Sequence, residues 1–467
     1  MKNLIRKALP LFISLAIAPL AHADLIKEHA GAWLGDMKIP NGPTLKLGVE
    51  LFTRADGNSW ASIALPSQNN FNIPVSSVVE KDGRLHLVFS GKVHMKLKWA
   101  NDHFDAEFQE QGGPALTFAM NQVAKLPMPQ RPQTPQAPFP YTNEEIAIPS
   151  TEGVVLSATL STPKNKSKPN AVILVHGAGP NDRNETGDGH QPFWVLADHL
   201  ARQGIAVIRY DKRGIAKSSG DYEQHTGQLL SDDLYAVVNA AKARHQFNKI
   251  GVIGHSEGPG IAASMFAQHP KAVDFMVSMG GIGLPGLQMM LLQDNATAKA
   301  NGATPNEVQT IVGYAKKFYT IMLAEDDLEK RMKLLNEHHA QSTEAVALIK
   351  KYKMNSEGGS LSLLEAAKPA MRAILSADTT TDWRKVSVPV LALNGTLDQQ
   401  VPIDSLHGLA AALKAGGNRR ARVIALPKLN HMFQTASTGA EDEYATIEES
   451  FAPIALQKIA EFVAKQK

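Results

Sequence analysis

The N-terminal part of the chain alternates apolar and polar residues with a period of two over residues 30–123. Leu45, Leu47, Val49 and Leu51 share one face of the first such run. The alternation returns over residues 93–99 and 104–108, and pairs of glycine, aspartate and asparagine separate the runs as turns. Short strands at this spacing predict an antiparallel meander, curled into a barrel or a sandwich so that few edges stay free. The pattern fits a structural or docking module as well as a ligand-binding barrel.

A proline-rich segment follows, with six prolines between Pro127 and Pro140. Proline has no backbone N–H and favours an extended polyproline conformation, so this segment cannot join the interior of a sheet. We therefore predict a small antiparallel all-β domain over residues 24–125, a semi-rigid linker over 126–140 and a second domain over 141–467.

In the second domain, short apolar runs rich in β-branched residues alternate with helical patterns. Strands are expected at residues 145–148, 154–160, 171–175, 205–210, 250–253, 275–279, 388–394 and 423–426. This rhythm predicts an α/β domain with a mostly parallel sheet that is covered by helices on both faces.

The strand at 250–253 ends in the run Gly254-His255-Ser256-Glu257-Gly258, and a helical pattern begins directly afterwards. A serine on so tight a strand-to-helix turn projects its hydroxyl from the backbone, and the flanking glycines let the strand and the helix approach closely. This pattern is typical of the nucleophile elbow of serine hydrolases, which makes Ser256 the candidate nucleophile. The alternative is a serine that caps the following helix.

Two more candidates for the same chemistry follow later strands. Asp398 comes shortly after the strand at 388–394, and His431 follows the strand at 423–426. Serine, then aspartate, then histidine is the chain order of α/β-hydrolases. His431 would remove the serine proton, and Asp398 would orient the imidazole and offset its charge. Asp404 and Asp442 are the nearest rivals for the acid, and Asp404 is expected to cap a helix.

Backbone N–H groups are expected to stabilise the oxyanion of the transition state. Glu257 supplies one such group because it follows the nucleophile, and Ala178, in the loop after the strand at 171–175, supplies the other. His176 is placed beside the substrate pocket. The Glu257 side chain is expected to contact the substrate or to pair with Arg183 or Arg213.

The stretch over residues 284–377 has no strand pattern and carries apolar residues at helical spacing. Because it is inserted between the sixth and seventh strands, it is predicted to form a helical cap over the nucleophile, where it would exclude water. Candidates to line the substrate pocket are Met289, Met290, Tyr314, Phe318 and Tyr319. The alternative is that these side chains fill the core of the cap itself.

Five segments resemble bacterial secreted α/β-hydrolases, which are commonly labelled esterases or serine-aminopeptidase-like hydrolases and often carry a small N-terminal β domain. The segments are HGAGPNDRNE, RYDKRGIAKSSGD, GHSEGPG, LNGTLDQQVP and LPKLNHMFQTA. The resemblance extends from about Gly31 onward and implies the same three triad residues. Pro259 and Ala216 depart from it, since the family usually has glycine at both positions. Pro259 falls in the first helical turn, where its missing N–H is not needed.

Residues 1–23 have the pattern of a signal peptide: three basic residues, an apolar run and then Ala21-His22-Ala23. A transmembrane anchor is the alternative, but the apolar run is shorter than the roughly 20 residues that a span needs. We expect cleavage after Ala23 and export to the periplasm or beyond.

Composition narrows the function further. The three basic residues of the signal segment account for the whole formal charge of +3, so the remaining chain is neutral and nucleic acid is not an expected partner. The absence of cysteine excludes disulfides, thiolate metal sites and a cysteine nucleophile. His338 and His339 lie in a run of mixed charges typical of a solvated helix face, and we expect no metal and no cofactor.

Three functions are compatible with these features. The leading hypothesis is a hydrolase of small carboxylic esters that works through an acyl-enzyme. The second is a serine aminopeptidase, which would need an acidic group, expected in the cap, to bind the substrate amine. The third is a non-catalytic binding protein on a hydrolase scaffold, against which the complete triad argues. The esterase is favoured because the charges at 325–331 look solvent-facing and the apolar stripe of the cap suits an acyl chain. The oligomeric state is left open.

Overall fold

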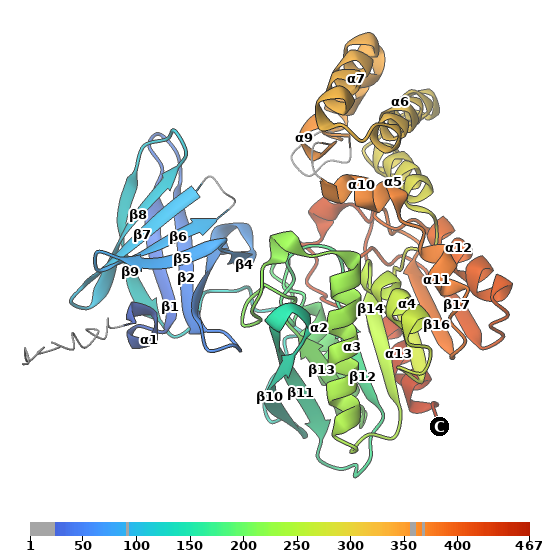
Figure 1. The fold of residues 1–467 in the computed structure, drawn as a ribbon, viewed down its shortest axis with the longest axis horizontal. Helices are drawn as coiled ribbons and strands as arrows, with labels where there is room; N and C mark the ends of the chain where they lie inside the picture. The colour runs from blue at the N-terminus through green and yellow to red at the C-terminus, as the bar shows by residue number, and fades with distance from the viewer. Residues whose placement is uncertain (1–23, 90–92, 355–360, 367–368) are drawn as a thin grey trace, which may run out of the picture.

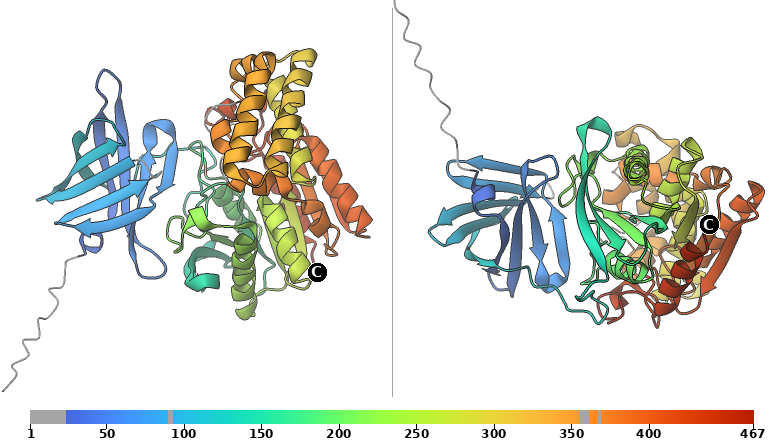
Figure 2. Two further views of the ribbon diagram at one scale, coloured as in Figure 1. Left: turned by 45° about the horizontal axis from the view of Figure 1, so that its top comes forward. Right: turned by 90° about the horizontal axis from the view of Figure 1, so that it is seen from below.

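The computed structural model of the chain describes residues 24–89, 93–354, 361–366 and 369–467. The predicted signal peptide, residues 1–23, lies outside these ranges. Within them, no helix is long and apolar enough to cross a membrane. An N-terminal β domain and a larger α/β domain lie side by side in each view (Figure 1, Figure 2).

Nine antiparallel strands form the described sheet of the β domain, after the short helix α1 (Leu25–Glu28). The strands are β1 (Gly31–Lys38), β2 (Thr44–Thr53), β3 (Ser59–Leu65), β4 (Asn70–Pro74), β5 (Ser77–Lys81), β6 (Arg84–Phe89), β7 (Val93–Ala100), β8 (His103–Glu110) and β9 (Leu116–Val123). Their order is β4-β3-β2-β1-β9-β8-β7-β6-β5, so that β1 pairs with both β2 and β9 while β4 and β5 form the two ends. The predicted antiparallel all-β domain is confirmed, as a half-barrel.

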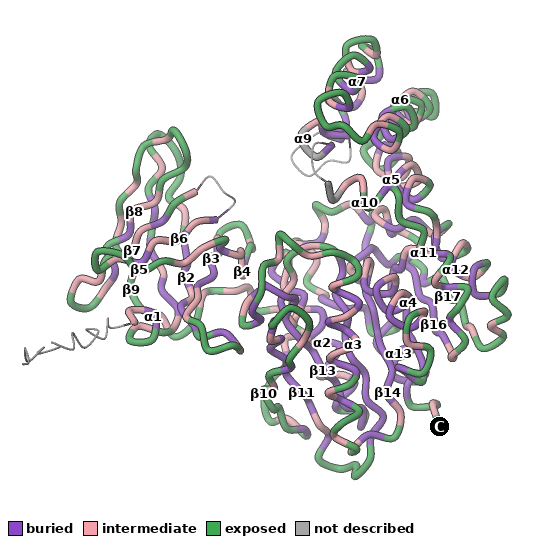
Figure 3. The backbone as a smooth tube through the Cα atoms, in the orientation of Figure 1, coloured by how far each residue is buried: buried purple, intermediate pink, exposed green. Residues whose placement is uncertain are grey.

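The period-two pattern explains the core of this domain. Leu47, Val49 and Leu51 of β2 are buried, as are Met95 and Leu97 of β7, because alternate side chains point into the half-barrel. Glu50 of β2 and Lys96 of β7, which lie between these residues, are closer to solvent, whereas Gly48 is buried (Figure 3).

The second described sheet has eight strands in the order β10-β11-β13-β12-β14-β15-β16-β17. The strands are β10 (Tyr141–Pro149), β11 (Val155–Pro163), β12 (Ala171–Val175), β13 (Ala206–Tyr210), β14 (Ile250–His255), β15 (Phe275–Met279), β16 (Val390–Gly395) and β17 (Ala421–Leu426). β11 is antiparallel to both neighbours, and the strands from β13 to β17 are parallel. Every predicted strand is present, and only some of the ends differ by a few residues.

Helices cover both faces of this sheet. They are α2 (Pro192–Arg202), α3 (Gly227–Ala243), α4 (Gly258–Gln268), α11 (Thr379–Trp383), α12 (Ile403–Ala415) and α13 (Pro453–Ala464). The 3-10 turns of this domain are η2 (Thr151–Gly153), η3 (Tyr222–Gln224) and η4 (Glu441–Glu443), and η1 (Pro66–Gln68) lies between β3 and β4 of the β domain. α3, α4, α11 and α12 pack on one face and α2 and α13 on the other, which gives two separate apolar cores. The parallel strands are buried on both faces for this reason (Figure 3). This is the predicted α/β-hydrolase fold.

The helical insertion stands between β15 and β16 and projects beyond the edge of the sheet (Figure 1). It consists of α5 (Gly286–Ala300), α6 (Pro305–Ala324), α7 (Leu328–Gln341), α8 (Thr343–Lys351), α9 (Leu363–Ala366) and α10 (Pro369–Ser376). These helices share an apolar core of their own. The predicted helical insertion is therefore confirmed, and its position over the nucleophile stays a prediction.

One expectation for the cap was wrong. His338 does not lie on a solvated face of α7: it is buried, and its ring stacks on Tyr314 with the centroids 4.4 Å apart. Its Nε2 lies 3.1 Å from the Tyr314 carbonyl oxygen. α7 packs against α6, so one face of this charged helix is covered although its composition is polar.

The proline-rich linker is held against the α/β domain. The Arg131 guanidinium donates hydrogen bonds to the backbone carbonyls of Gly189, Ala445 and Ile447. The Gln133 side chain also accepts hydrogen bonds from backbone N–H groups shortly before α13. The linker is therefore bound to the surface of the α/β domain by these hydrogen bonds, in addition to connecting the two domains.

Candidate active site

The elbow at the end of β14 holds Ser256 in a left-handed backbone conformation, with a φ of 56°. Residues other than glycine rarely adopt this backbone conformation, and such strain is often found at functional positions. A Cβ atom on Gly258 would lie 2.2 Å from the Val175 carbonyl oxygen, and one on Gly254 would lie 2.4 Å from the Pro259 nitrogen. Only glycine fits at either position. Pro259 lies in the first turn of α4, as predicted.

Asp398 and His431 form a buried pair near the elbow. His431 Nδ1 lies 3.0 Å and 2.9 Å from the two carboxylate oxygens of Asp398. The Val401 N–H donates a further hydrogen bond to the carboxylate at 2.8 Å, which fixes its orientation. Since Nδ1 donates to Asp398, Nε2 of His431 is left as a proton acceptor.

Ser256 and His431 line one cavity of about 550 Å³. The structure thus brings together the three residues that the sequence analysis selected. Neither rival acid is hydrogen-bonded to His431 in the described part of the chain. Asp404 is exposed in the first turn of α12, whose N-cap is Pro402, so the expectation that it caps the helix was wrong. Asp442 is exposed and also lines the cavity.

A second histidine–carboxylate pair lies beneath the first and was missed from the sequence. His255 Nδ1 is 3.1 Å from Glu185 Oε1, and His255 Nε2 is 3.0 Å from the carbonyl oxygen of His431. The same Glu185 oxygen accepts a hydrogen bond from the Gly177 N–H at 2.7 Å. Both side chains are buried. Both ring nitrogens of His255 face hydrogen-bond acceptors. Only the charged imidazolium carries a proton on each nitrogen, so only this form can donate to both acceptors.

The titration behaviour of this pair follows from burial and charge. Burial alone lowers the pKa of His255, but the charge and hydrogen bond of Glu185 outweigh it, so the pKa is raised. Burial likewise raises the pKa of Glu185, and the His255 charge outweighs it, so that pKa is lowered. Glu185 lies in the segment HGAGPNDRNE and His255 in GHSEGPG, but the spacing of these segments does not predict that the two side chains meet.

Backbone groups near Ser256 are arranged to bind an anion. Ala178 lines the cavity, and no described residue accepts a hydrogen bond from the N–H of Ala178 or of Glu257. Lys212 is buried, and its Nζ donates to the carbonyl oxygens of Gly177 at 2.6 Å and Gly179 at 3.1 Å. These bonds fix the loop in which Ala178 lies.

The partner of Glu257 differs from both expected ones. Its carboxylate lies 3.4 Å from Lys212 Nζ. Arg183 is bound to Asp211 and Arg213 to Asp233, both buried acids. Those arginines are therefore already neutralised.

None of the six residues that were predicted to line the substrate pocket lines the cavity at Ser256. The His176 ring is fully buried between Phe193 and Tyr210, and burial lowers its pKa to about 4. Tyr314 and Phe318 are buried in the core of the cap. Their apolar spacing reflects the packing of α6 against its neighbours, which was the alternative explanation.

The described lining of the cavity is acidic instead. Asp188, Glu441 and Asp442 line it, while lysine and arginine are missing from this lining. The acids come from the loop after β12 and from the segment between β17 and α13.

We predict that the His255–Glu185 pair stabilises the fold in a pH-dependent way. Because the pKa of Glu185 is lowered in the folded protein, its carboxylate contributes fully to the free energy of unfolding above about pH 4.5, and this contribution is lost as the pH falls. Because the pKa of His255 is raised in the folded protein, its imidazolium contributes fully to the free energy of unfolding below about pH 6.5, and this contribution is lost as the pH rises. His255→Gln should therefore lower the Tm more at about pH 6 than at about pH 9. An equal loss at both pH values would mean that His255 is neutral in the folded protein.

Two curated esterases match part of this chain. Esterase EstD of Thermotoga maritima is 33% identical over 103 residues, which cover 22% of this chain and 25% of EstD. Esterase FrsA of Yersinia pestis is 28% identical over 145 residues, which cover 31% of this chain and 33% of FrsA. The chain thus matches a quarter to a third of the length of these curated relatives.

Among solved structures, Est1E of Butyrivibrio proteoclasticus with bound ferulic acid is 17% identical, with a TM-score of 0.42 and coverage of 69% of this chain and 98% of that one. Proline iminopeptidase of Mycobacterium smegmatis is 16% identical, with a TM-score of 0.42 and the same coverage.

A family model described as serine aminopeptidase, S33, matches residues 166–435. This range runs from just before β12 to just after His431, so it includes all three residues of the serine, aspartate and histidine group. Because the match covers more than half of the chain, the protein belongs to the serine aminopeptidase S33 family of the serine hydrolases.

Proposed function

We propose that the protein hydrolyses carboxylic esters through an acyl-enzyme formed on Ser256. The observation that carries the proposal is the pairing of His431 with Asp398, beside a serine held in a strained elbow on the same cavity. A serine hydroxyl needs an adjacent base to become nucleophilic, and this arrangement provides one.

The reaction follows from these positions. His431 Nε2 takes the proton of Ser256 as the oxygen attacks the ester carbonyl, and the Asp398 carboxylate stabilises the resulting imidazolium. The N–H groups of Ala178 and Glu257 stabilise the oxyanion, each contributing about 3 kcal/mol in the transition state. His431 then protonates the departing alcohol, and water hydrolyses the acyl-enzyme by the same steps.

The relatives favour an ester substrate. EstD and FrsA are both named esterases, and a third relative is protein phosphatase methylesterase 1 of Candida albicans, 22% identical over 145 residues that cover 31% of this chain and 35% of that protein. Their matches support the ester bond as the one cleaved, and the acyl and alcohol groups are open to experiment.

A serine aminopeptidase is the second candidate, and the charge of the cavity favours it. Asp188, Glu441 and Asp442 line the cavity without a lysine or arginine in its described lining, which suits a substrate with a protonated amine. The acidic groups lie in loops of the α/β domain, whereas the sequence analysis expected them in the cap.

We also propose that the enzyme acts outside the cytoplasm, since residues 1–23 have the composition of a signal peptide. Proteolytic removal of this segment and recovery of activity in the periplasmic or secreted fraction would support this location.

Ser256→Ala is expected to abolish ester hydrolysis with the fold intact. Loss of the nucleophile of a triad typically lowers kcat by about 10⁶, and His431→Ala should cost about as much. Turnover of p-nitrophenyl acetate and labelling by a serine-reactive phosphonate, followed by peptide mapping, measure the effect. A Ser256→Ala protein with native circular dichroism and wild-type turnover would disprove the assignment.

Asp398→Asn should lower kcat by about 10⁴ because an amide stabilises the wrong imidazole tautomer. Asp404→Asn is the matched control: Asp404 is exposed on α12, so kcat should stay at the wild-type value. The reverse order of effects would place the acid elsewhere.

The two candidate substrates are separated by direct comparison of kcat/KM. We expect p-nitrophenyl acetate and butyrate to exceed aminoacyl-p-nitroanilides, including that of proline. A higher kcat/KM on any aminoacyl anilide would establish the peptidase, because activated esters are intrinsically easier to cleave. Asp442→Asn should then weaken the anilide reaction and leave the ester reaction unchanged.

A further inference from the structure

We propose that the N-terminal β domain is a positioning element of the active site, acting on the two loops that hold the oxyanion-binding backbone. The loops are the β12–α2 loop, residues 176–191, and the β13–η3 loop, residues 211–221. The inference rests on the proposed function for its catalytic consequence, and the family match at residues 166–435 does not extend to this domain.

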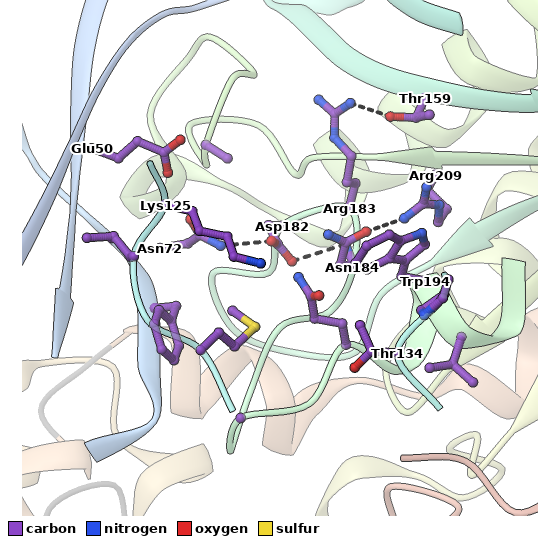
Figure 4. A pocket seen from close by; sticks show the side chains of 18 of the residues that line it. Glu50, Asn72, Lys125, Thr134, Thr159, Asp182, Arg183, Asn184, Trp194 and Arg209 are labelled. Carbon is purple, nitrogen blue, oxygen red and sulfur yellow. Dashed lines mark hydrogen bonds between the residues drawn. The ribbon is translucent and has the colours of Figure 1, made fainter. Parts of the chain in front are cut away.

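The first contact joins β4 to the β12–α2 loop. Asn72 Nδ2 donates a hydrogen bond to Asp182 Oδ2 at 2.8 Å, across the boundary between the domains (Figure 4). Asp182 is buried, and its other oxygen accepts hydrogen bonds from the N–H groups of Asn184 and Thr186. A buried carboxylate is costly unless its lone pairs are satisfied, so the donor from the β domain stabilises this turn.

The turn that Asp182 organises contains Glu185, and Glu185 connects it to the catalytic groups. Its carboxylate binds the Gly177 N–H and His255, and His255 binds the carbonyl oxygen of His431. The Glu185 N–H also donates to the Asp182 carbonyl oxygen at 2.9 Å. A continuous series of polar contacts, part-buried at Asn72 and buried from Glu185 onward, therefore leads from Asn72 to the backbone of the proposed base. A displacement of the turn would move both the oxyanion loop and His431.

The second contact joins the β2–β3 turn to the β13–η3 loop. Arg54 is buried, lies over the Trp60 ring at 3.8 Å, and donates a 2.8 Å hydrogen bond from Nη2 to the Gly214 carbonyl oxygen. The Ala55 N–H donates to the Lys217 carbonyl oxygen at 2.8 Å. The same loop carries Lys212, whose Nζ binds the carbonyl oxygens beside Ala178.

The rest of the boundary between the domains is open. A cavity of about 820 Å³ with many polar side chains lies there, bordered by Glu50 of the β domain and Arg209 of the α/β domain (Figure 4). Hydrogen bonds from Asn72, Arg54 and Ala55 cross this boundary, and each of them ends on one of the two loops.

The test uses the full chain and substitutions that the backbone tolerates. Asn72 has a φ of 55°, so Asn72→Gly removes the side chain without adding strain. Asn101 has a φ of 62° in an exposed turn of the same domain, so Asn101→Gly is the matched control. Arg54→Met removes the guanidinium, which donates to the other loop and lies over the Trp60 ring, and keeps an unbranched side chain at this position.

Asn72→Gly should lower kcat by roughly 10- to 100-fold with KM within about twofold, since small misplacements of catalytic groups have effects of this size. Labelling of Ser256 by the phosphonate should slow by the same factor, and Asn72→Asp should be slower still because two carboxylates would meet. Asn101→Gly should match the wild type. An unchanged kcat and labelling rate in folded Asn72→Gly would overturn the proposal.

Hydrogen exchange gives a readout that does not depend on activity. Amides in residues 176–191 should exchange at least about tenfold faster in Asn72→Gly, and those in 211–221 in Arg54→Met, while α3 and α13 keep wild-type protection. Unchanged exchange in both loops would refute the positioning role even if the enzyme proved inactive on esters. Wild-type protein that neither cleaves esters nor reacts at Ser256 would instead refute the proposed function.

Discussion

The close approach of β12, β14 and α4 at the elbow is the constraint on which the rest of the site depends. A single Cβ at Gly258 would overlap the carbonyl group of Val175, so the first turn of α4 packs directly on the end of β12. Ser256 is therefore half-buried just beyond the end of β14, and the loop that follows β12 begins beside it. The nucleophile and the oxyanion donors are brought together by backbone packing, before any side chain is considered.

Around this elbow, charged side chains are buried in pairs. Asp398 binds His431, and Glu185 binds His255, whose ring centroid lies 4.8 Å from that of His431. Burying a charge is costly unless a partner and further hydrogen bonds compensate for it, and both carboxylates also accept backbone N–H groups. The Asp398–His431 pair therefore joins the loops after β16 and β17, and the Glu185–His255 pair joins the loop after β12 to the elbow.

The acidic side chains of the cavity and the apolar side chains of the cap lie in different parts of the α/β domain, although the sequence predicted that the cap would supply both to the substrate pocket. Tyr314 and Phe318 lie in the core of the cap, and no described residue of the cap lines the cavity at Ser256. The cavity beside Ser256 takes its charge from loops of the α/β domain, among them Asp188 and Asp442. These loops therefore set which substrate charge the cavity favours, and their acidic side chains suit an amine-bearing substrate as well as a neutral ester.

The sequence by itself determined the two domains, the eight strands of the α/β sheet, the elbow and the three residues Ser256, Asp398 and His431, because each depends on local periodicity or on chain order. The tertiary structure alone decided which distant side chains meet. His255 and Glu185 are 70 residues apart, and Asn72 and Asp182 are 110 apart. Such contacts arise from the crossing of chain segments in the fold, for which neither periodicity nor spacing carries a signal.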